Sequence, residues 1–206
     1  MKPFSVGITG GIGSGKSFVS RCLEAKGIPV FYTDVEARLE MLSNVGLHHR
    51  LSQLLQTSVL LSDGSLNKPL LSDFIRKGHQ QAAQVNELVH PLVRERFNRW
   101  KGRQQEVPCV VMECALLFEA GFDQEVDLTV CVTAPLEVRI KRVMERDGKT
   151  RAEVQQWIEM QMADDEKERR AHLLLNNDGR LTSEVLVNQL LTVVRSRIYL
   201  VTEHFL

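Results

Sequence analysis

The stretch FSVGITGGIGSGKS, which runs from Phe4 to Ser17, decides the fold of this chain. Its second half has the spacing Gly10-x-x-x-x-Gly15-Lys16-Ser17, the pattern of a phosphate-binding loop, or P-loop. The apolar run 4–8 in front of the loop is typical of a buried strand, and the glycines let backbone N–H groups surround an anion. The sequence therefore predicts a strand, a phosphate-binding loop and a helix, in that order.

The residues at the end of the loop indicate nucleotide chemistry. Lys16 is placed to reach the β- and γ-phosphates of a nucleotide, and the Ser17 hydroxyl is placed to ligate Mg²⁺. The helix that begins near Lys16 points its positive dipole end at the same anion. The alternative is a glycine-rich turn with an exposed lysine, which the strand in front and the apolar Val19 and Leu23 behind make less favourable.

Length and charge narrow the class of protein. The chain has 206 residues, enough for one compact domain with an inserted subdomain. Lys and Arg total 26, as do Asp and Glu, so the formal net charge is zero. A general nucleic-acid or membrane-surface binder needs a basic excess or stripe, so we expect neither kind of partner. A small anionic substrate needs only a local positive pocket, and we expect a monomer or weak homo-oligomer.

The cysteines and the termini favour a cytoplasmic protein. The four cysteines form no C-x-x-C pair, and three lie in apolar segments, which is typical of buried free thiols in a reducing compartment. The first strand begins near the N-terminus without a signal segment, and no apolar stretch approaches the ~18 residues of a membrane span.

Short apolar runs alternate with longer helical patterns, as in a parallel sheet covered on both faces. The expected strands are 4–9, 28–32, 107–112, 128–132 and 173–175. The expected helices outside the middle segment are 16–26, 135–146, 151–170 and 182–196. The predicted fold class is α/β, a P-loop NTPase-type parallel five-stranded sheet flanked by helices.

The segment 35–105 differs from the rest of the chain. It is helical in period, has no obvious buried strand, and is interrupted by the turn 62–65 and by His90-Pro91. We expect a helical substrate-binding insert at the carboxyl edge of the sheet, where open α/β sheets bind ligands. The nucleotide-binding core is then formed by 1–34 and 106–206.

A P-loop occurs in switches, motors and kinases alike. A GTPase needs a guanine-reading Asn-Lys-x-Asp, and Asn67-Lys68-Pro69-Leu70 lacks the final Asp and lies beside a turn. A large ATPase usually has a strand that ends in a metal-binding Asp, whereas this chain offers Glu113 after an apolar run. That glutamate is a weaker match, and a solvated acid at a strand end is an equal alternative.

Asp34 follows the second expected strand, at the sheet edge that carries the P-loop. A kinase needs a carboxylate there to accept the hydroxyl proton of its substrate. The alternative is structural, because Thr33-x-x-Glu36 has the spacing of a capping box and Asp34 then only favours the first turn of a helix.

Arg139, Arg142 and Arg146 share one face of the helix after the fourth strand. Arginine neutralises charge on a transferring phosphoryl group, so this stripe suits a lid that closes over ATP. The alternative is a solvated face paired with Glu137 and Glu145.

Two further positions have a double interpretation. Asn177 lies in a turn after the last apolar run, where its amide can also read the edge of a purine. His90-Pro91 has the pattern of a helix start with Pro at the first position, and His90 can instead contact a phosphate or a substrate hydroxyl.

The order of these motifs resembles the dephospho-coenzyme A kinase family over about residues 4–195. The matching segments are the P-loop 8–17, Asp34, His90-Pro91-Leu92, Leu116-Leu117-Phe118-Glu119, Lys141 to Asp147, Thr150-Arg151, Gln161 and Asn177-Asp178-Gly179. Departures from the family pattern are Tyr32 in place of an acid, Phe18 in place of Thr, Ala115 in place of Pro, and His172 in place of Asp.

The resemblance implies transfer of the γ-phosphoryl of ATP to the 3′-hydroxyl of dephospho-CoA, the last step of coenzyme A synthesis. It implies Asp34 as general base and Lys16 and Arg142 as further catalytic residues, with Mg²⁺ on Ser17. It implies acceptor contacts from Asp34, His90 and Leu116, and a lid over about 146–170. The nucleotide contacts that it implies are Gly11, Ile12, Gly13, Ser14, Gly15, Lys16, Ser17, Phe18, Arg142, Arg146 and Asn177.

The alternative on the same architecture is another small-molecule or nucleoside monophosphate kinase, which also closes an arginine lid over ATP. The length of the insert favours an extended acceptor. A non-catalytic nucleotide-binding switch is the alternative of a different class, and it predicts binding without turnover.

Overall fold

A computed structural model describes residues 2–203 of the chain. The chain forms two compact units, one made of the residues up to Tyr32 and from Lys101 onwards, the other of Thr33–Trp100. Among the described residues, no helix has both the length and the apolar character needed to cross a membrane.

The first unit is built on a five-stranded parallel sheet with the order β2-β3-β1-β4-β5. Its strands are β1 (Phe4–Thr9), β2 (Val30–Tyr32), β3 (Cys109–Glu113), β4 (Leu128–Thr133) and β5 (Leu173–Asn176). The central strand β1 pairs with β3 through Val6 and Val111 and with β4 through Val6 and Leu128. The predicted α/β class is confirmed, and the strand boundaries differ from the expected ones by at most two residues at each end.

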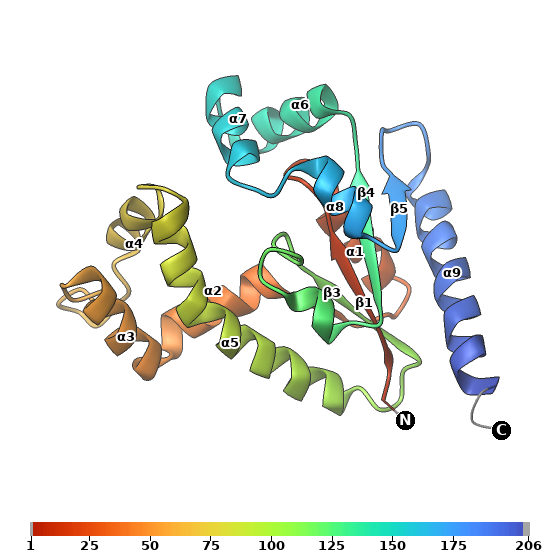
Figure 1. The fold of residues 1–206 in the computed structure, drawn as a ribbon, viewed down its shortest axis with the longest axis horizontal. Helices are drawn as coiled ribbons and strands as arrows, with labels where there is room; N and C mark the ends of the chain where they lie inside the picture. The colour runs from red at the N-terminus through yellow and green to blue at the C-terminus, as the bar shows by residue number, and fades with distance from the viewer. Residues whose placement is uncertain (1, 204–206) are drawn as a thin grey trace. The chain divides into compact units, whose positions relative to one another are not determined.

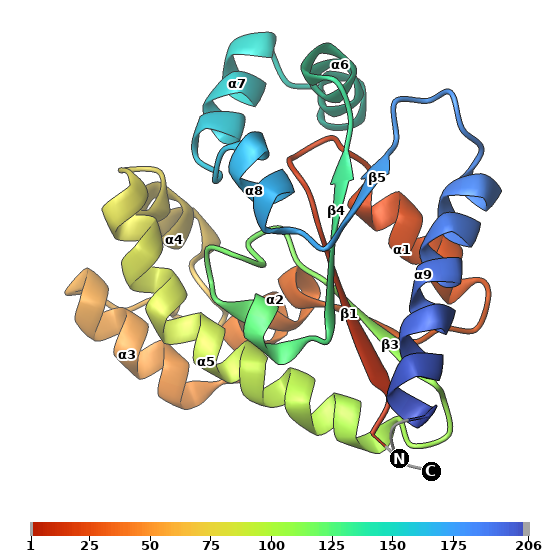
Figure 2. The same ribbon diagram turned by 45° about the vertical axis from the view of Figure 1, so that its right-hand side comes forward.

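Two helices pack against one face of this sheet. They are α1 (Lys16–Glu24) and α9 (Ser183–Glu203), which lie side by side in Figures 1 and 2. Buried side chains of α1 and α9, including Leu23 and Leu190, join those of the strands in one apolar cluster. The other face of β1 packs against the segment after β3, which ends in the short 3₁₀ helix η1 (Phe122–Glu125).

A run of three helices joins β4 to β5: α6 (Leu136–Asp147), α7 (Arg151–Glu159) and α8 (Asp164–Arg170). The expected single helix 151–170 is wrong, because the chain leaves the helical conformation between Met160 and Ala163. Asp164, Asp165 and Glu166 form an acidic first turn, which favours a new helix start through its dipole. The break places residues 160–163 as a loop beside the P-loop.

The second unit contains the helices α2 (Thr33–Ser43), α3 (Val45–Leu55), α4 (Lys68–Ile75) and most of α5 (His79–Arg103). Its described residues include no strand, only an isolated antiparallel bridge between Leu60 and Leu66. Asn67 caps α4 by accepting from the Leu70 N–H, with Pro69 in the first turn. Asn67-Lys68 is thus a helix start, which the sequence did not predict but which agrees with its rejection as a guanine-reading motif.

The predicted helix start at His90-Pro91 is wrong. Pro91 lies inside the 25-residue helix α5, which continues through both residues. Proline at this position cannot donate the hydrogen bond to the carbonyl four residues earlier, at Glu87. The helix tolerates this loss because the rest of its length forms hydrogen bonds on either side and buries apolar side chains such as Val89 and Val93.

Candidate active site

The P-loop joins the carboxyl end of β1 to the start of α1. Gly15 stands at the N-cap of α1 with φ 98°, a left-handed conformation that favours glycine. The loop closes on itself through a hydrogen bond from the Ser14 N–H to the Gly11 carbonyl, 3.1 Å long. Lys16 and Ser17 follow as the first residues of α1 and are partly exposed. This strand–loop–helix arrangement is the one that presents backbone N–H groups to a phosphate.

Arg142 and Asn177 contact backbone carbonyls of the P-loop. The Asn177 amide is buried and donates through Nδ2 to the Ser14 carbonyl at 2.8 Å. Arg142 donates through Nη1 to the Asn177 carbonyl at 3.0 Å and lies 3.5 Å from the Gly13 and Ser14 carbonyls. A Cβ atom at Gly15 would overlap the Asn177 amide, so glycine is also required there by packing. The turn that carries Asn177 is therefore fastened to the P-loop, and a contact between Asn177 and adenine stays a prediction.

Arg139 lies directly over Gly11. Its side chain is only 3% exposed and pairs with the Asp164 carboxylate, with Nη1–Oδ1 at 2.8 Å and Nη2–Oδ2 at 2.7 Å. The alternative of a solvated arginine face is therefore wrong for Arg139, and Arg142 is half-buried against the loop. The predicted partners Glu137 and Glu145 pair instead with Arg151 and Lys141.

Arg146 behaves differently from the other two arginines of the stripe. It is 62% exposed and makes a bidentate contact with its neighbour Asp147, with both distances at 2.7 Å. This pairing lowers the pKa of Asp147, chiefly through the hydrogen bond from Arg146. Of the expected lid arginines, Arg142 contacts the P-loop and Arg146 does not.

The loop between α7 and α8 contacts the P-loop through Gln161. Its Oε1 accepts from the Ile12 N–H at 2.9 Å. Next to it, Glu119 accepts from the Met162 N–H at 3.1 Å and pairs with the fully buried Lys167 at 3.0 Å. Lys167 also donates to the Ala115 carbonyl at 3.3 Å, so α8 is anchored to the segment after β3.

Sequence reasoning missed Asp164 and Lys167. Both lie in the charged run from Asp164 to Arg170, which is typical of a solvated helix, and nothing in that run marks one lysine as buried. The resemblance places both residues in the expected lid segment, about 146–170, but gives neither of them a role. The backbone carbonyl of Ala115, which a proline would offer equally, accepts from Thr9 Oγ1 and Lys167 Nζ, so the departure at this position leaves these two contacts possible.

Ser17 lies beside an acid at the end of β3. Its hydroxyl donates to Glu113 Oε1 at 3.2 Å, and Glu113 is 4% exposed. The nearby Tyr32 hydroxyl donates to Glu24 at 3.2 Å, and burial, followed by the charge of Glu24, raises the pKa of Tyr32 to about 12. Tyr32 thus stays neutral at physiological pH, and the acid that Ser17 contacts is Glu113.

Four further predicted residues lie in other parts of the chain. Phe18 is 43% exposed on the first turn of α1, and Leu116 is half-buried in the segment after β3. Asp34 is an exposed residue in the first turn of α2, and His90 is a half-buried residue of α5, both in the second unit. The roles of all four stay predictions.

The cysteines are free thiols, as expected, and three of them are buried. Burial raises the pKa of Cys109 and of Cys131 to about 12, so neither forms a thiolate at neutral pH. Within the described part of the chain, no three His, Cys, Asp or Glu side chains gather as a metal-binding cluster.

The sheet, the P-loop after its central strand and the arginine helix after β4 together define the P-loop kinase fold class. The fold is shared with the crystal structure of shikimate kinase from Bacteroides thetaiotaomicron, at a TM-score of 0.54 and 15% sequence identity over 93% of this chain and 98% of that one. The crystal structure of TT1252 from Thermus thermophilus is more similar, at a TM-score of 0.79 and 34% identity over 95% and 98% of the two chains.

The sequence model of the dephospho-CoA kinase family matches residues 4–183. A dephospho-CoA kinase of Bacteroides fragilis is 40% identical over 189 residues, which cover 92% of this chain and 90% of the relative. This chain belongs to the dephospho-CoA kinase family.

Proposed function

We propose that this chain transfers the γ-phosphoryl of ATP to the 3′-hydroxyl of dephospho-CoA, the last step of coenzyme A biosynthesis. As a member of this kinase family it is an ATP-dependent phosphotransferase. The observation that carries the proposal is the P-loop held by Arg142 and Asn177 in a chain whose family match spans the core and the insert.

The nucleotide half of the site rests on residues of the first unit. The loop from Gly11 to Phe18 and the Lys16 ammonium bind the phosphates of ATP, because the loop offers backbone donors at a helix N-terminus and the lysine adds positive charge. Arg142 stabilises the charge that develops during transfer, and its contacts with the carbonyls of Asn177 and of Gly13 in the P-loop fix its position. Arg146 joins it in the lid, about 146–170, and Asn177 lies near the adenine.

Mg²⁺ fits the oxygen donors at the end of the loop. This ion is usually held by one or two protein groups together with substrate phosphates and water. Ser17 Oγ and Glu113 Oε1, 3.2 Å apart, are such a pair of hard donors. When bound, the ion neutralises charge on the β- and γ-phosphates.

Asp34 accepts the proton of the acceptor hydroxyl in this proposal. It is exposed in the first turn of α2, directly after β2 in the chain, where a carboxylate can act as a general base. His90 and Leu116 contact the acceptor, and the insert 35–105 binds dephospho-CoA, with 1–34 and 106–206 as the nucleotide-binding core.

We place the protein in the cytoplasm, as a monomer or weak homo-oligomer, without nucleic-acid or membrane partners. The length of the insert favours an extended acceptor over a small one, so another small-molecule or nucleoside monophosphate kinase is the less favoured alternative.

The decisive assay measures phosphoryl transfer from Mg·ATP to dephospho-CoA, with AMP, CMP, dTMP and shikimate as competing acceptors. We expect turnover with dephospho-CoA alone. Turnover only with a nucleoside monophosphate or with shikimate would reject the proposed substrate, and nucleotide binding without any turnover would favour a switch.

The role of Asp34 is tested by Asp34→Asn. We expect kcat to fall by at least about 10², the low end for the loss of a general base, with the Kd for ATP changed by only a few fold. Asp73→Asn, on the exposed Asp73–Arg76 pair of α4, is the matched control. Equal kcat for the two variants would reduce Asp34 to a helix-start residue.

A further inference from the structure

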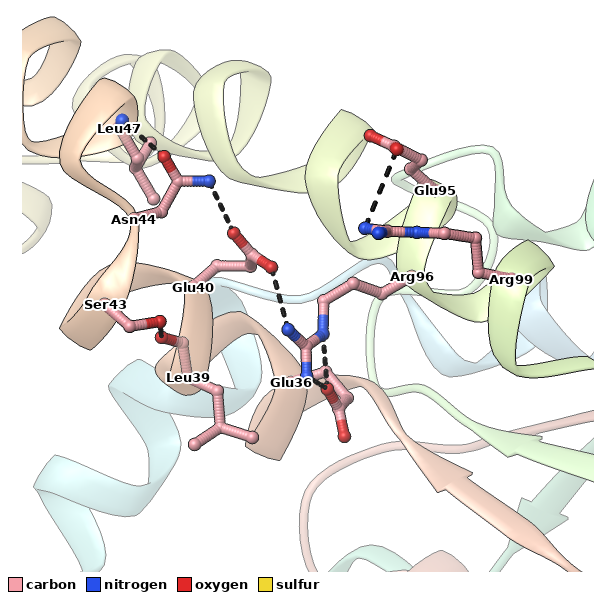
Figure 3. A network of polar contacts seen from close by, with 9 residues as sticks. All are labelled: Glu36, Leu39, Glu40, Ser43, Asn44, Leu47, Glu95, Arg96 and Arg99. Carbon is pink, nitrogen blue, oxygen red and sulfur yellow. Dashed lines mark hydrogen bonds and ion pairs between the residues drawn. The ribbon is translucent and has the colours of Figure 1, made fainter.

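Helix α2, which carries Asp34, is joined to α5 by one arginine. Arg96 Nε donates to Glu36 Oε2 at 2.6 Å, and Arg96 Nη1 donates to Glu40 Oε1 at 3.1 Å (Figure 3). The network continues from Glu40 Oε2 to Asn44 Nδ2 at 2.7 Å, and Asn44 Oδ1 accepts from the Leu47 N–H at the start of α3. Three helices of the second unit are therefore connected through Arg96.

The spacing of the two acids fixes the rotation of α2. Glu36 and Glu40 are one turn apart and share a face, so one guanidinium contacts the helix at two levels. Asp34 precedes Glu36 by two residues, which places it about 200° around the helix axis. Arg96 therefore holds α2 by the face that Asp34 does not occupy, and any rotation of α2 that breaks these bonds also turns Asp34.

Apolar packing does not replace this contact. The buried residues of α2 are Thr33 and Glu40, whereas Leu39 and Leu42 are 42% and 43% exposed. The Glu40 side chain is 9% exposed and that of Arg96 is 34% exposed. Without the arginine, the carboxylates of Glu36 and Glu40 would face each other on one turn, and that of Glu40 would be buried without its cation. This repulsion and burial disfavour the observed rotation of α2 about its axis.

We propose that Arg96 is a positioning residue that fixes the rotation of the first turns of α2 and thereby the direction of Asp34. The proposal rests on the role of Asp34 as general base. The reaction is sensitive to such a change, because a displacement of about 1 Å of a reacting group can lower the rate by on the order of 10².

The test compares Arg96→Gln with Arg99→Gln. Arg99 lies on the same helix in an exposed pair with Glu95, 3.6 Å apart, so the same substitution there removes the same charge without touching α2. We expect Arg96→Gln to lower kcat with dephospho-CoA by about 10- to 10²-fold, with the KM for ATP within twofold, and Arg99→Gln to leave both within twofold. Arg96→Lys keeps the charge and should recover part of kcat.

A second comparison separates positioning from general loss of structure. In an Asp34→Asn background no base remains to be positioned, so adding Arg96→Gln should lower kcat no further. The proposal would be overturned if Arg96→Gln lowered kcat by the same factor in the unmodified chain and in Asp34→Asn. Equal kcat for Arg96→Gln and Arg99→Gln would also overturn it. If Arg96→Gln does not fold, Arg96→Lys and Arg99→Lys are compared instead, and equal kcat overturns it.

The same experiments distinguish the two levels of the proposal. If the unmodified chain does not phosphorylate dephospho-CoA, the proposed function fails. If it does and Asp34→Asn keeps full kcat, the base assignment fails and the role of Arg96 fails with it. If Asp34→Asn is impaired and Arg96→Gln is not, only the role of Arg96 is rejected.

Discussion

The Ile12 N–H of the P-loop donates to Oε1 of Gln161, 2.9 Å away, in the loop between α7 and α8. One backbone N–H of the P-loop is thus already bonded to a side chain. Because glutamine is neutral, this contact adds no negative charge beside the loop. The loop between α7 and α8 is therefore directly bonded to the P-loop, and the effect of a charge at residue 161 can be tested.

We expect Gln161→Glu to weaken ATP binding. A carboxylate at this position repels the phosphates, and two like charges about 4 Å apart near a protein surface interact by about 4 kcal/mol before screening. Only part of this repulsion remains in solution, so the Kd for ATP should rise by about tenfold, or ~1.4 kcal/mol. Isothermal titration calorimetry measures this directly. Gln155→Glu, at an exposed position of α7, is the control, and equal affinities for the two variants would contradict the prediction.

Gly11→Ala should disrupt the Arg139–Asp164 pair. A Cβ atom at Gly11 would overlap Arg139 Nη1 and lie 2.6 Å from Asp164 Oδ1, so the buried guanidinium must move. Such overpacking costs about 1–3 kcal/mol, which urea unfolding can measure. Gly102→Ala is the control, since a Cβ atom there meets nothing within 4 Å, and in a helix alanine is favoured by up to about 1 kcal/mol. An unchanged free energy of unfolding in Gly11→Ala would show that Arg139 has room to shift.

Glu153→Ala should reduce stability in a pH-dependent way. Glu153 closes the capping box of α7, and its pKa is lowered from 4.5 to about 2 by the Thr150 N–H, then by Lys149 and the Thr150 hydroxyl. Because the folded-state pKa is lowered, the stabilisation is present above pH 4.5 and is lost as the pH falls towards 2. The difference in Tm between the two proteins should therefore shrink over this range.

The control for the capping box is Glu159→Ala, at the exposed end of the same helix. It removes the same side chain without breaking the box, so its Tm difference should be smaller at neutral pH. A Glu153→Ala difference that stays constant from pH 5 to pH 2 would show that the carboxylate charge contributes nothing.

The sheet was predictable because its signals are local. The strand Phe4–Thr9 has apolar side chains at alternate positions, Phe4, Val6 and Ile8, and the loop glycines follow at fixed spacing. Both the strand and the start of α1 at Lys16 are confirmed. The break after Met160 was not predictable, because the run 151–170 has no proline or glycine within it. At Pro91 the sequence predicted a helix start where the helix in fact continues, because tertiary packing of α5 overrides a local helix-breaking signal.

The site was predictable only in its P-loop half. Lys16 and Ser17 belong to a contiguous motif, whereas Arg139 and Asp164 lie 25 residues apart and meet only after α6, α7 and α8 have folded together. Burial of Lys167 depends on Glu119 and on the Ala115 carbonyl, and no periodicity encodes partners so distant in sequence. The roles of Asp34, His90 and Leu116 stay predictions.

The order of the strands has a consequence for biosynthesis. β1 pairs only with β3 and β4, and β2 pairs only with β3, so neither N-terminal strand has a sheet partner until Cys109 has been translated. At typical elongation rates the roughly 100 residues between Val6 and its partner Val111 take about 5 to 20 s. During this interval the helices of the compact unit Thr33–Trp100 leave the ribosome after β1 and β2 but before β3, so the two N-terminal strands have no sheet partner to cover their edges. The nascent chain is therefore most prone to aggregation before the nucleotide-binding sheet can close.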